Sequence, residues 1–434
     1  MEQRRKNLTQ LFIPICLETL LYMLSGMVDT LMLSSVNDQA VGAVGTANTY
    51  IGIFIIMFSV ISSGMVAVMT QNIGAGRPGV AYQARQLGLA FNAVLGVIMS
   101  LFLSLGAGTI LSGVGVADAL MQPAKTYLQI VGGFCILNAL IPICSSYLRA
   151  FGFSKEPLYA SIIGNVINFC LNAFFLFVLH KGVAGVATAT VISRIINLVI
   201  VVLLGAVLVK AKQHPERESN RAVMGQIIRI GLPSACETAI YNVSMTLVIR
   251  FLNQMDAQGL NVTARSYTMQ ITNFSYCVGA ALAQANAIMT GWHIGAKEYD
   301  ACDRGTKKAA VIGVIVAVIL ETVFTQLFSK DPQMVSLVGK LLAIDIVLEI
   351  GRVTNLVYGQ ALKTSGDAVF PVVMGACFMI LCSVGGTYLF GIRLGLLAVG
   401  AYIGMTGDEC VRAVGMYLRW KSGKWKEKGL VKSR

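Results

Sequence analysis

The sequence predicts an all-α membrane protein with twelve transmembrane helices, arranged as two pseudo-symmetric six-helix lobes. The chain has 434 residues, of which 56% are hydrophobic and only 13% are charged. A soluble protein carries about 25% charged residues. Apolar stretches recur along the whole chain, each long enough to cross about 30 Å of hydrocarbon as a helix. Because backbone groups in lipid must form hydrogen bonds within the chain, we expect these stretches to be helical.

An internal repeat predicts the two lobes. Three short motifs occur twice, in the same order. They are PxxxETxxY at 14–22 and 233–241, IGA at 73–75 and 294–296, and LxxxGxxxxP at 148–157 and 362–371. Duplicated, strongly hydrophobic proteins are commonly transporters, whose binding sites lie at the interface of the repeats near the bilayer midplane. The repeat therefore indicates transport.

The apolar pattern places each span in turn. The first apolar run follows the charged residues 2–6, and it is too long and lacks the small-residue cleavage site of a signal peptide. We therefore read it as the first membrane helix. The predicted spans are 8–34, 40–71, 83–112, 119–147, 157–179, 183–209, 223–253, 260–291, 303–328, 333–361, 370–391 and 395–418.

The lysine and arginine residues are concentrated on one side of the predicted membrane topology. The net charge of +13 would suit nucleic-acid binding, but most of the 34 lysine and arginine residues lie at the N-terminus, in the loops after even-numbered spans, and in the tail 419–434. This positive-inside pattern sets orientation, so we expect cytoplasmic termini and no nucleic-acid partner. The basic tail is also expected to contact membrane lipid. The short termini favour a bacterial cytoplasmic (inner) membrane.

The polar segment 210–222 divides the chain. Its sequence KAKQHPERESNR over 210–221 is the longest polar stretch, and we interpret it as a cytoplasmic linker between lobes 1–209 and 223–418. Six spans precede it, so the second lobe enters the membrane in the same sense as the first. The ten cysteines are scattered without metal-ligand spacing, which predicts buried apolar packing.

Four segments resemble the MATE (multidrug and toxic compound extrusion) transporters. Residues 14–30 with 43–45 resemble the first-helix signature of that family, and 231–237 resemble the opening of its second lobe. Residues 361–367 (ALKTSGD) resemble its LRGAGD element, with Lys, Thr and Ser at the Arg, Gly and Ala positions. Asn168-x-x-x-Asn172 resembles the Asn-x-x-x-Asp of the fifth helix.

The resemblance implies a fold and an activity. The fold would be two six-helix bundles that form a V-shaped cleft, and the activity would be export of cationic lipophilic drugs in exchange for H⁺ or Na⁺. A lipid-linked oligosaccharide flippase of a related fold is the alternative. It would need cationic residues for a pyrophosphate, and Arg194, Arg250 and Arg265 are the candidates, although they do not cluster in the sequence.

Asp29 is the first candidate for ion coupling. An ionisable residue inside a span costs about 2.5–3.5 kcal/mol on insertion scales, so it requires a reason. Asp29 has no lysine or arginine at i±3 or i±4 on its own helix. The resemblance makes it a proton or Na⁺ site. The alternative is an aspartate that caps backbone at a water-filled helix end.

Asn168 and Asn172 lie one helical turn apart and share a face. The resemblance makes them partners of Asp29, with Thr190 as a further contact. Asn172 stands where some family members have a second Asp, so the predicted site has one titratable group. The alternative role is interhelical hydrogen bonding, worth about 0.6–2 kcal/mol per contact.

Each lobe has a further acid at the same position of the repeat. Glu18 and Glu237 occupy equivalent repeat positions, each four residues after a proline that permits a kink. They could bind substrate, or a cation such as Na⁺ at Glu237, or they could satisfy freed backbone groups. Tyr241 is a candidate substrate contact, since aromatic faces attract cations.

Asp345 is a further candidate for cation or substrate binding in the second lobe. On the same helix we predict a structural ion pair between Glu349 and Arg352 at i,i+3. Asp408, Glu409 and Arg412 offer similar local pairing, which we also interpret as structural.

The remaining expectations are mostly negative. No nucleophile–base or metal constellation is recognisable, so we expect no enzyme and no cofactor beyond the coupling ion. The glycine turns 74–77 and 295–297 could cradle phosphate, but helix capping is favoured. The expected partners are small cationic amphiphiles and lipid, and the expected state is a monomer.

Overall fold

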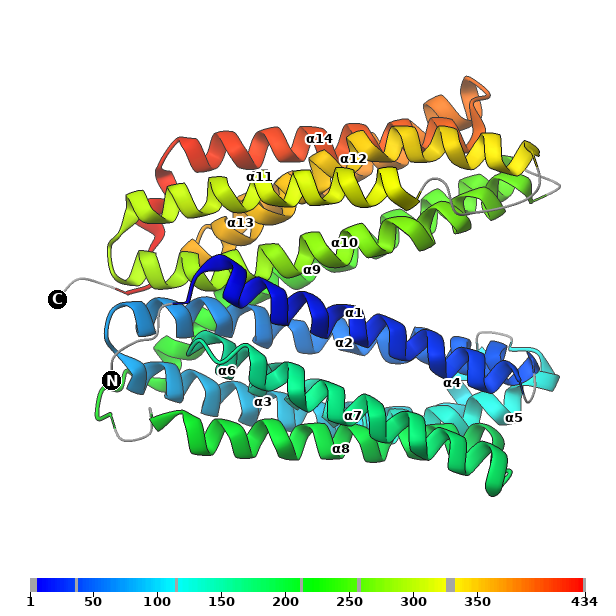
Figure 1. The fold of residues 1–434 in the computed structure, drawn as a ribbon, viewed down its shortest axis with the longest axis horizontal. Coiled ribbons are helices and arrows are strands. Elements are labelled where there is room, and N and C mark those ends of the chain that lie inside the picture. The colour runs from blue at the N-terminus through cyan, green and yellow to red at the C-terminus, as the bar shows by residue number, and fades with distance from the viewer. Residues whose placement is uncertain are drawn as a thin grey trace. The chain divides into compact units, whose positions relative to one another are not determined.

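The computed structural model describes residues 6–35, 38–113, 116–210, 214–255, 259–324 and 332–431. These residues form helices and no strands (Figure 1). Every predicted span coincides with one helix or with consecutive helices, which confirms an all-α membrane protein. The last residues of the ninth predicted span, 325–328, lie outside the described residues. Contacts divide the chain into two compact units, residues 1–69 with 77–231 and residues 70–76 with 232–434.

The first unit contains helices α1 to α8, except for the C-terminal end of α2. Their bounds are α1 (Leu8–Ser34), α2 (Asp38–Gly74), α3 (Pro78–Leu105), α4 (Ala107–Gly113), α5 (Asp118–Tyr127), α6 (Ile136–Ala150), α7 (Lys155–Ala173) and α8 (Gly182–Leu208). Helix α7 packs on both α1 and α8, and α6 packs on α3 and α8. These contacts place α1, which carries Asp29, beside α7, which carries Asn172.

The second unit contains the remaining helices. Their bounds are α9 (Asn220–Met255), α10 (Leu260–Gly295), α11 (Tyr299–Phe324), α12 (Pro332–Ser365), α13 (Val369–Phe378) and α14 (Leu397–Lys421), with the short η6 (Lys424–Lys428) at the end. Helix α12 packs on α10, α11 and α14, so it is central to this unit. The boundary between the units falls inside α9, and the predicted lobe limits at 209 and 223 remain a prediction.

Several predicted spans are interrupted helices. Helices α5 and α6 are joined through the π-helical turn η1 (Leu128–Gly132) and bend by 43° at the break. The π-helical turn η2 (Phe174–Val178) extends α7, and two such turns, η4 (Met379–Val384) and η5 (Thr387–Arg393), extend α13. Each π-helical turn opens the i→i−4 ladder locally and marks an irregular segment within a span.

The two units differ in how many of their helices are long and apolar. Six helices are long and apolar enough to cross a membrane by composition, or seven with the bent pair, and five of the six lie mainly in the first unit. Helices α9 to α12 and α14 fall outside this set although each has 25 residues or more. Together they carry most of the buried polar side chains of the second unit, and polar side chains lower the mean hydropathy of a helix.

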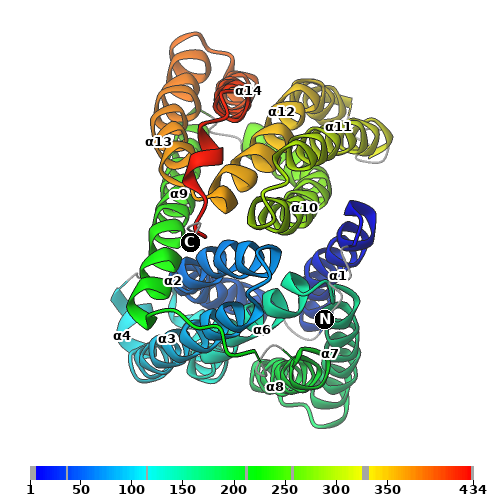
Figure 2. The ribbon, with the colours of Figure 1, turned by 90° about the vertical axis from the view of Figure 1, so that its left-hand side faces the viewer.

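The C-terminal tail docks on the second unit. Trp420 and Trp425 stack with ring centroids 4.1 Å apart, and η6 packs on α12 and α14 (Figure 2). Arg419 forms an ion pair of 2.7 Å with Asp367, and the backbone N–H of Leu430 donates to Gln71 Oε1 at 2.8 Å. The described part of the predicted basic tail is therefore tied to protein, while its contact with lipid stays a prediction.

The two IGA motifs of the repeat meet within the second unit. A Cβ atom on Gly74 would lie 2.2 Å from the Trp292 carbonyl oxygen, and a Cβ atom on Gly295 would lie 2.0 Å from the Gln71 carbonyl oxygen. Both distances are far below van der Waals contact. Glycine at each position therefore lets the C-terminal ends of α2 and α10 touch through their backbones.

Replacing Gly295 with alanine tests this close approach. Because the added methyl group meets backbone rather than a flexible side chain, we expect Gly295→Ala to lower the free energy of unfolding by about 1–3 kcal/mol. The measurement is the thermal unfolding midpoint in detergent. Gly305→Ala on α11 is the control, since no atom lies within 4 Å of its Cβ position. Its midpoint should hold or rise, because alanine favours helix, and an equal loss in both variants would refute the packing argument.

Candidate functional site

In the first unit the structure brings Asp29 and Asn172 together. The Asn172 amide Nδ2 donates to Asp29 Oδ1 at 2.6 Å and to Asn168 Oδ1 at 3.3 Å. Asn168 and Asn172 are both buried on one face of α7, as their spacing predicts. The contact joins α1 to α7 through a carboxylate and two amides.

A positive charge on another helix lies near Asp29. Arg194 of α8 lies within electrostatic range of Asp29 but forms no ion pair of 4.0 Å or less with it among the described residues. Thr190, one turn earlier on α8, donates its hydroxyl to the Val186 carbonyl of its own helix at 2.9 Å. Sequence analysis did not predict that Arg194 lies near Asp29, because the two residues are on different helices.

One polar atom at this site remains open. Asn172 Oδ1 is buried and accepts no hydrogen bond from any described residue. This oxygen belongs to the same amide group whose nitrogen donates to the Asp29 carboxylate. A proton on Asp29, a water or a small cation could each use this acceptor, so the cluster is chemically suited to a change of charge at Asp29.

The two repeat-related glutamates have the same kind of partner. Glu18 on α1 pairs with Arg149 on α6 at 2.5 Å, and Glu237 on α9 pairs with Lys363 on α12 at 2.6 Å. All four side chains are at least 85% buried. Arg149 and Lys363 each directly follow the leucine of the LxxxG motif. Both halves of the repeat therefore contain the same ion pair. Aligning the two copies of the LxxxG motif would have identified Arg149 and Lys363 as equivalent bases.

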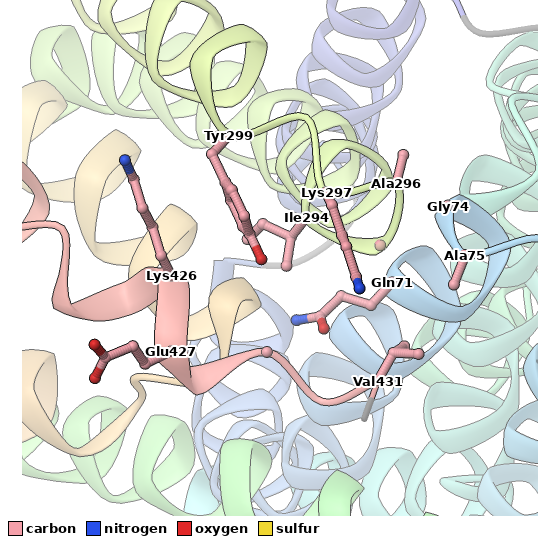
Figure 3. Close-up of a pocket in the computed structure, with 12 residues that line it drawn as sticks. Gln71, Gly74, Ala75, Ile294, Ala296, Lys297, Tyr299, Lys426, Glu427 and Val431 are labelled. Carbon is pink, nitrogen blue, oxygen red and sulfur yellow. The ribbon is translucent and has the colours of Figure 1, made fainter. Parts of the chain in front are cut away.

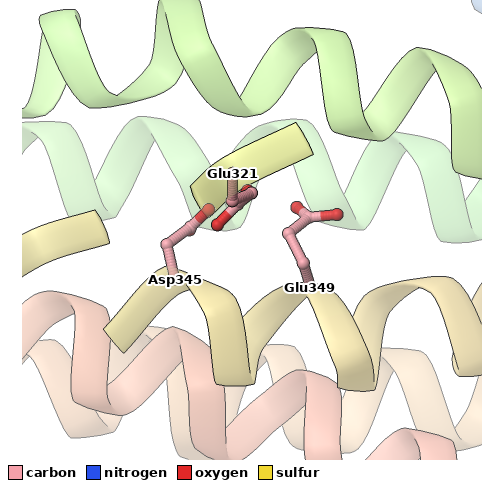
Figure 4. Close-up of side chains that lie close together, drawn as sticks. All are labelled: Glu321, Asp345 and Glu349. Atoms are coloured by element: carbon pink, nitrogen blue, oxygen red, sulfur yellow. The ribbon is translucent and has the colours of Figure 1, made fainter. Parts of the chain in front are cut away.

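The second unit contains a buried group of three carboxyls. Glu321 of α11 faces Asp345 and Glu349 of α12 (Figure 4), and one oxygen from each lies within 4.8 Å of the others. Oxygen ligands of this kind suit hard cations, so these three residues could hold a metal ion. Sequence analysis found Asp345 but missed Glu321, an acid inside an otherwise apolar run of α11.

Arginines neutralise part of this group. The predicted Glu349–Arg352 pair is present, and Arg352 also approaches Glu409 at 3.8 Å. Arg412 contacts Asp408 and Glu409, each at 2.8 Å. The network thus holds five carboxyl groups and two guanidinium groups, and its acids are buried. The excess of carboxyls must be offset by protons or cations, because unpaired buried charge is unfavourable.

The glycine turns form helix caps. They line a pocket of about 900 Å³ together with the C-terminal segment (Figure 3). Gly76 and Lys297 adopt the left-handed conformation of a helix C-terminus, with φ of 73° and 60°. The backbone N–H groups of Ala75, Gly76 and Lys297 all donate to carbonyls of their own helices. They are unavailable to cradle phosphate, in agreement with the favoured interpretation.

Comparisons with known proteins place the chain in one family. The MatE family model matches residues 14–174 and 233–389. The chain is 34% identical over 431 residues to the uncharacterized transporter YisQ of Bacillus subtilis (strain 168), covering 96% of this chain and 94% of the relative. It is 23% identical over 449 residues to the probable multidrug resistance protein NorM of Thermotoga maritima, covering 98% and 94%.

A solved structure has the same fold. It is the outward-facing conformation of a multidrug resistance MATE family transporter of the MOP superfamily, with a TM-score of 0.86 and 17% sequence identity. The match covers 97% of this chain and 96% of that chain.

The Glu237–Lys363 pair can be tested by a double-mutant cycle. Lys363→Met leaves a buried carboxylate without its partner, so we expect a loss of up to about 3–5 kcal/mol in the free energy of unfolding. Glu237→Gln combined with Lys363→Met should recover most of this loss, because no charge is then left unpaired. Thermal unfolding of the single and double variants measures both. Additive losses would mean that the two side chains do not interact.

Proposed function

The chain belongs to the MATE family, and we propose that it is a secondary active exporter of cationic lipophilic molecules, driven by H⁺ or Na⁺ moving inward. The observation that carries the proposal is the hydrogen bond between Asn172 and Asp29 at 2.6 Å. It holds the Asp29 carboxylate at a defined position, without an ion pair to any described residue. The relatives support the proposal by their names, transporter and probable multidrug resistance protein.

In the proposed cycle the charge of Asp29 controls affinity. Deprotonated Asp29 favours a cationic solute. A proton or Na⁺ from outside then neutralises the Asp29–Asn172–Asn168 cluster, and the solute leaves because its counter-charge is gone. Asn168, Asn172 and Thr190 contribute orientation and neutral oxygen ligands, and one titratable carboxyl supports transfer of one proton.

The energy available is adequate. One charge that crosses 100 mV yields about 2.3 kcal/mol. Each pH unit adds about 1.4 kcal/mol. Two pH units with 100 mV give about 5 kcal/mol, which supports a concentration gradient of several thousandfold.

In the second unit we assign cation contact to Asp345 rather than to Glu237 or Glu18. Both glutamates are held in close ion pairs by Lys363 and Arg149. Asp345 instead faces two further carboxyls in a network with more acids than bases. We further propose a monomer in the cytoplasmic membrane, with both termini cytoplasmic.

Asp29→Asn tests the coupling role. The amide keeps the size of the side chain but cannot gain or lose a proton at neutral pH, so efflux driven by a pH or Na⁺ gradient should fall to the background rate. The measurement is ethidium efflux from proteoliposomes, with the two gradients imposed separately. Asp118→Asn is the control, since Asp118 is exposed at the start of α5, and it should transport normally. Unchanged efflux in Asp29→Asn would make Asp29 a structural residue.

The same vesicles separate the alternative activity. A flippase would translocate a lipid-linked pyrophosphate and leave ethidium inside. Of its three candidate cations, Arg194 lies in the field of Asp29, Arg250 is exposed, and Arg265 is buried without an ion pair among the described residues.

A further inference from the structure

Arg265 of α10 differs from the other buried arginines. Three arginines in the described residues are less than 10% exposed, namely Arg149, Arg265 and Arg412. Arg149 and Arg412 each contact a carboxylate at close range. Arg265 is 7% exposed, forms no ion pair with any described residue, and has a buried Nε atom without a hydrogen-bond partner.

Its position in the fold does not explain this isolation. Arg265 lies about 8 Å along α10 from Leu260, the first residue of the helix. A guanidinium that is enclosed and unpaired destabilises a protein, and an apolar side chain of similar size would be neutral or better. An ionisable residue within a membrane helix is by default a candidate functional site, whose partner should be named. No acid of the described chain is that partner.

The groups around Arg265 are donors rather than acids. Electrostatic interactions connect it to the phenols of Tyr241 on α9 and Tyr402 on α14. Tyr241 is 39% exposed and Tyr402 is buried, so the group extends from the interior towards an accessible surface of the second unit. A phenol O–H can donate to an anion, and a guanidinium presents N–H groups as a planar fork.

We propose that Arg265, with Tyr241 and Tyr402, forms a contact for a carboxylate group on the transported molecule. A carboxylate accepts two parallel hydrogen bonds from a guanidinium, and this charge-assisted geometry is about twice as strong as a neutral hydrogen bond. The acids of the same unit attract positive groups. Solutes with both a positive centre and a carboxylate would therefore be preferred over the corresponding ester. The inference rests on the proposed export function and adds a specificity determinant to it.

A pair of dyes tests the inference. Rhodamine 123 is a cationic methyl ester, and rhodamine 110 is its free acid, which carries a carboxylate as well as the positive ring system. Efflux of each dye is measured in proteoliposomes for the unmodified protein, for Arg265→Met and for Arg265→Lys. We expect Arg265→Met to reduce kcat/KM for rhodamine 110 by at least about tenfold and to leave rhodamine 123 within about twofold. Arg265→Lys should recover part of the loss, because it restores charge but not the fork.

Stability supplies the second readout. Removal of an unpaired buried charge should leave the thermal midpoint of Arg265→Met unchanged or raise it. Arg250→Met on the exposed face of α9 is the control and should alter neither dye. A lower midpoint with equal losses for both dyes would overturn the inference and make Arg265 structural. Unchanged efflux of both dyes would overturn it too.

The two proposals can fail separately. If the unmodified protein moves neither dye, the export function itself is wrong, and the carboxylate contact loses its basis. If it moves rhodamine 123 but not rhodamine 110, export stands and the carboxylate contact is refuted.

Discussion

Charge buried in an apolar interior must be neutralised, and this constraint organises both units. In each unit a glutamate four residues after a proline is paired with a base that follows the leucine of the LxxxG motif. The proline opens the helix locally, and the ion pair ties the segment after it to a second helix. The duplication preserved this device although the basic residue changed from arginine to lysine, whose compact ammonium needs no bidentate geometry.

Beyond that shared pair the units differ in how they treat charge. The first unit holds Asp29 with two amides, and Asn172 replaces an acid that the family resemblance would allow there. The second unit holds five carboxyls with two guanidiniums around α12. One unit thus holds a carboxyl group by amides, and the other holds a network with more acids than bases. The acids and arginines of that network lie on α11, α12 and α14, and they lower the hydropathy of these three helices.

The sequence predicted what depends on a single helix or on the repeat. Apolar length located the spans, and i,i+3 or i,i+4 spacing found the pairs of Arg352 and Arg412 with acids on their own helices. It could not find Arg194 near Asp29 or Glu321 near Asp345, because such contacts depend on the rotation of two helices about their own axes. Many rotations satisfy the same apolar pattern, and packing selects among them. The partners of Glu18 and Glu237 were an intermediate case, since the repeat register held the information.

Incomplete neutralisation distinguishes three groups of polar side chains in the described residues from the paired glutamates. The buried pairs of Glu18 and Glu237 each join one acid to one base, so the two charges of each pair offset one another. Among the described residues, the carboxyl groups around Asp345 outnumber their bases, Asn172 Oδ1 accepts no hydrogen bond beside Asp29, and Arg265 forms no ion pair. Stability alone would replace such groups with apolar side chains. Their presence is consistent with a protein whose ions and solutes complete its charge balance in turn, and that is the physical requirement for coupling one flux to another.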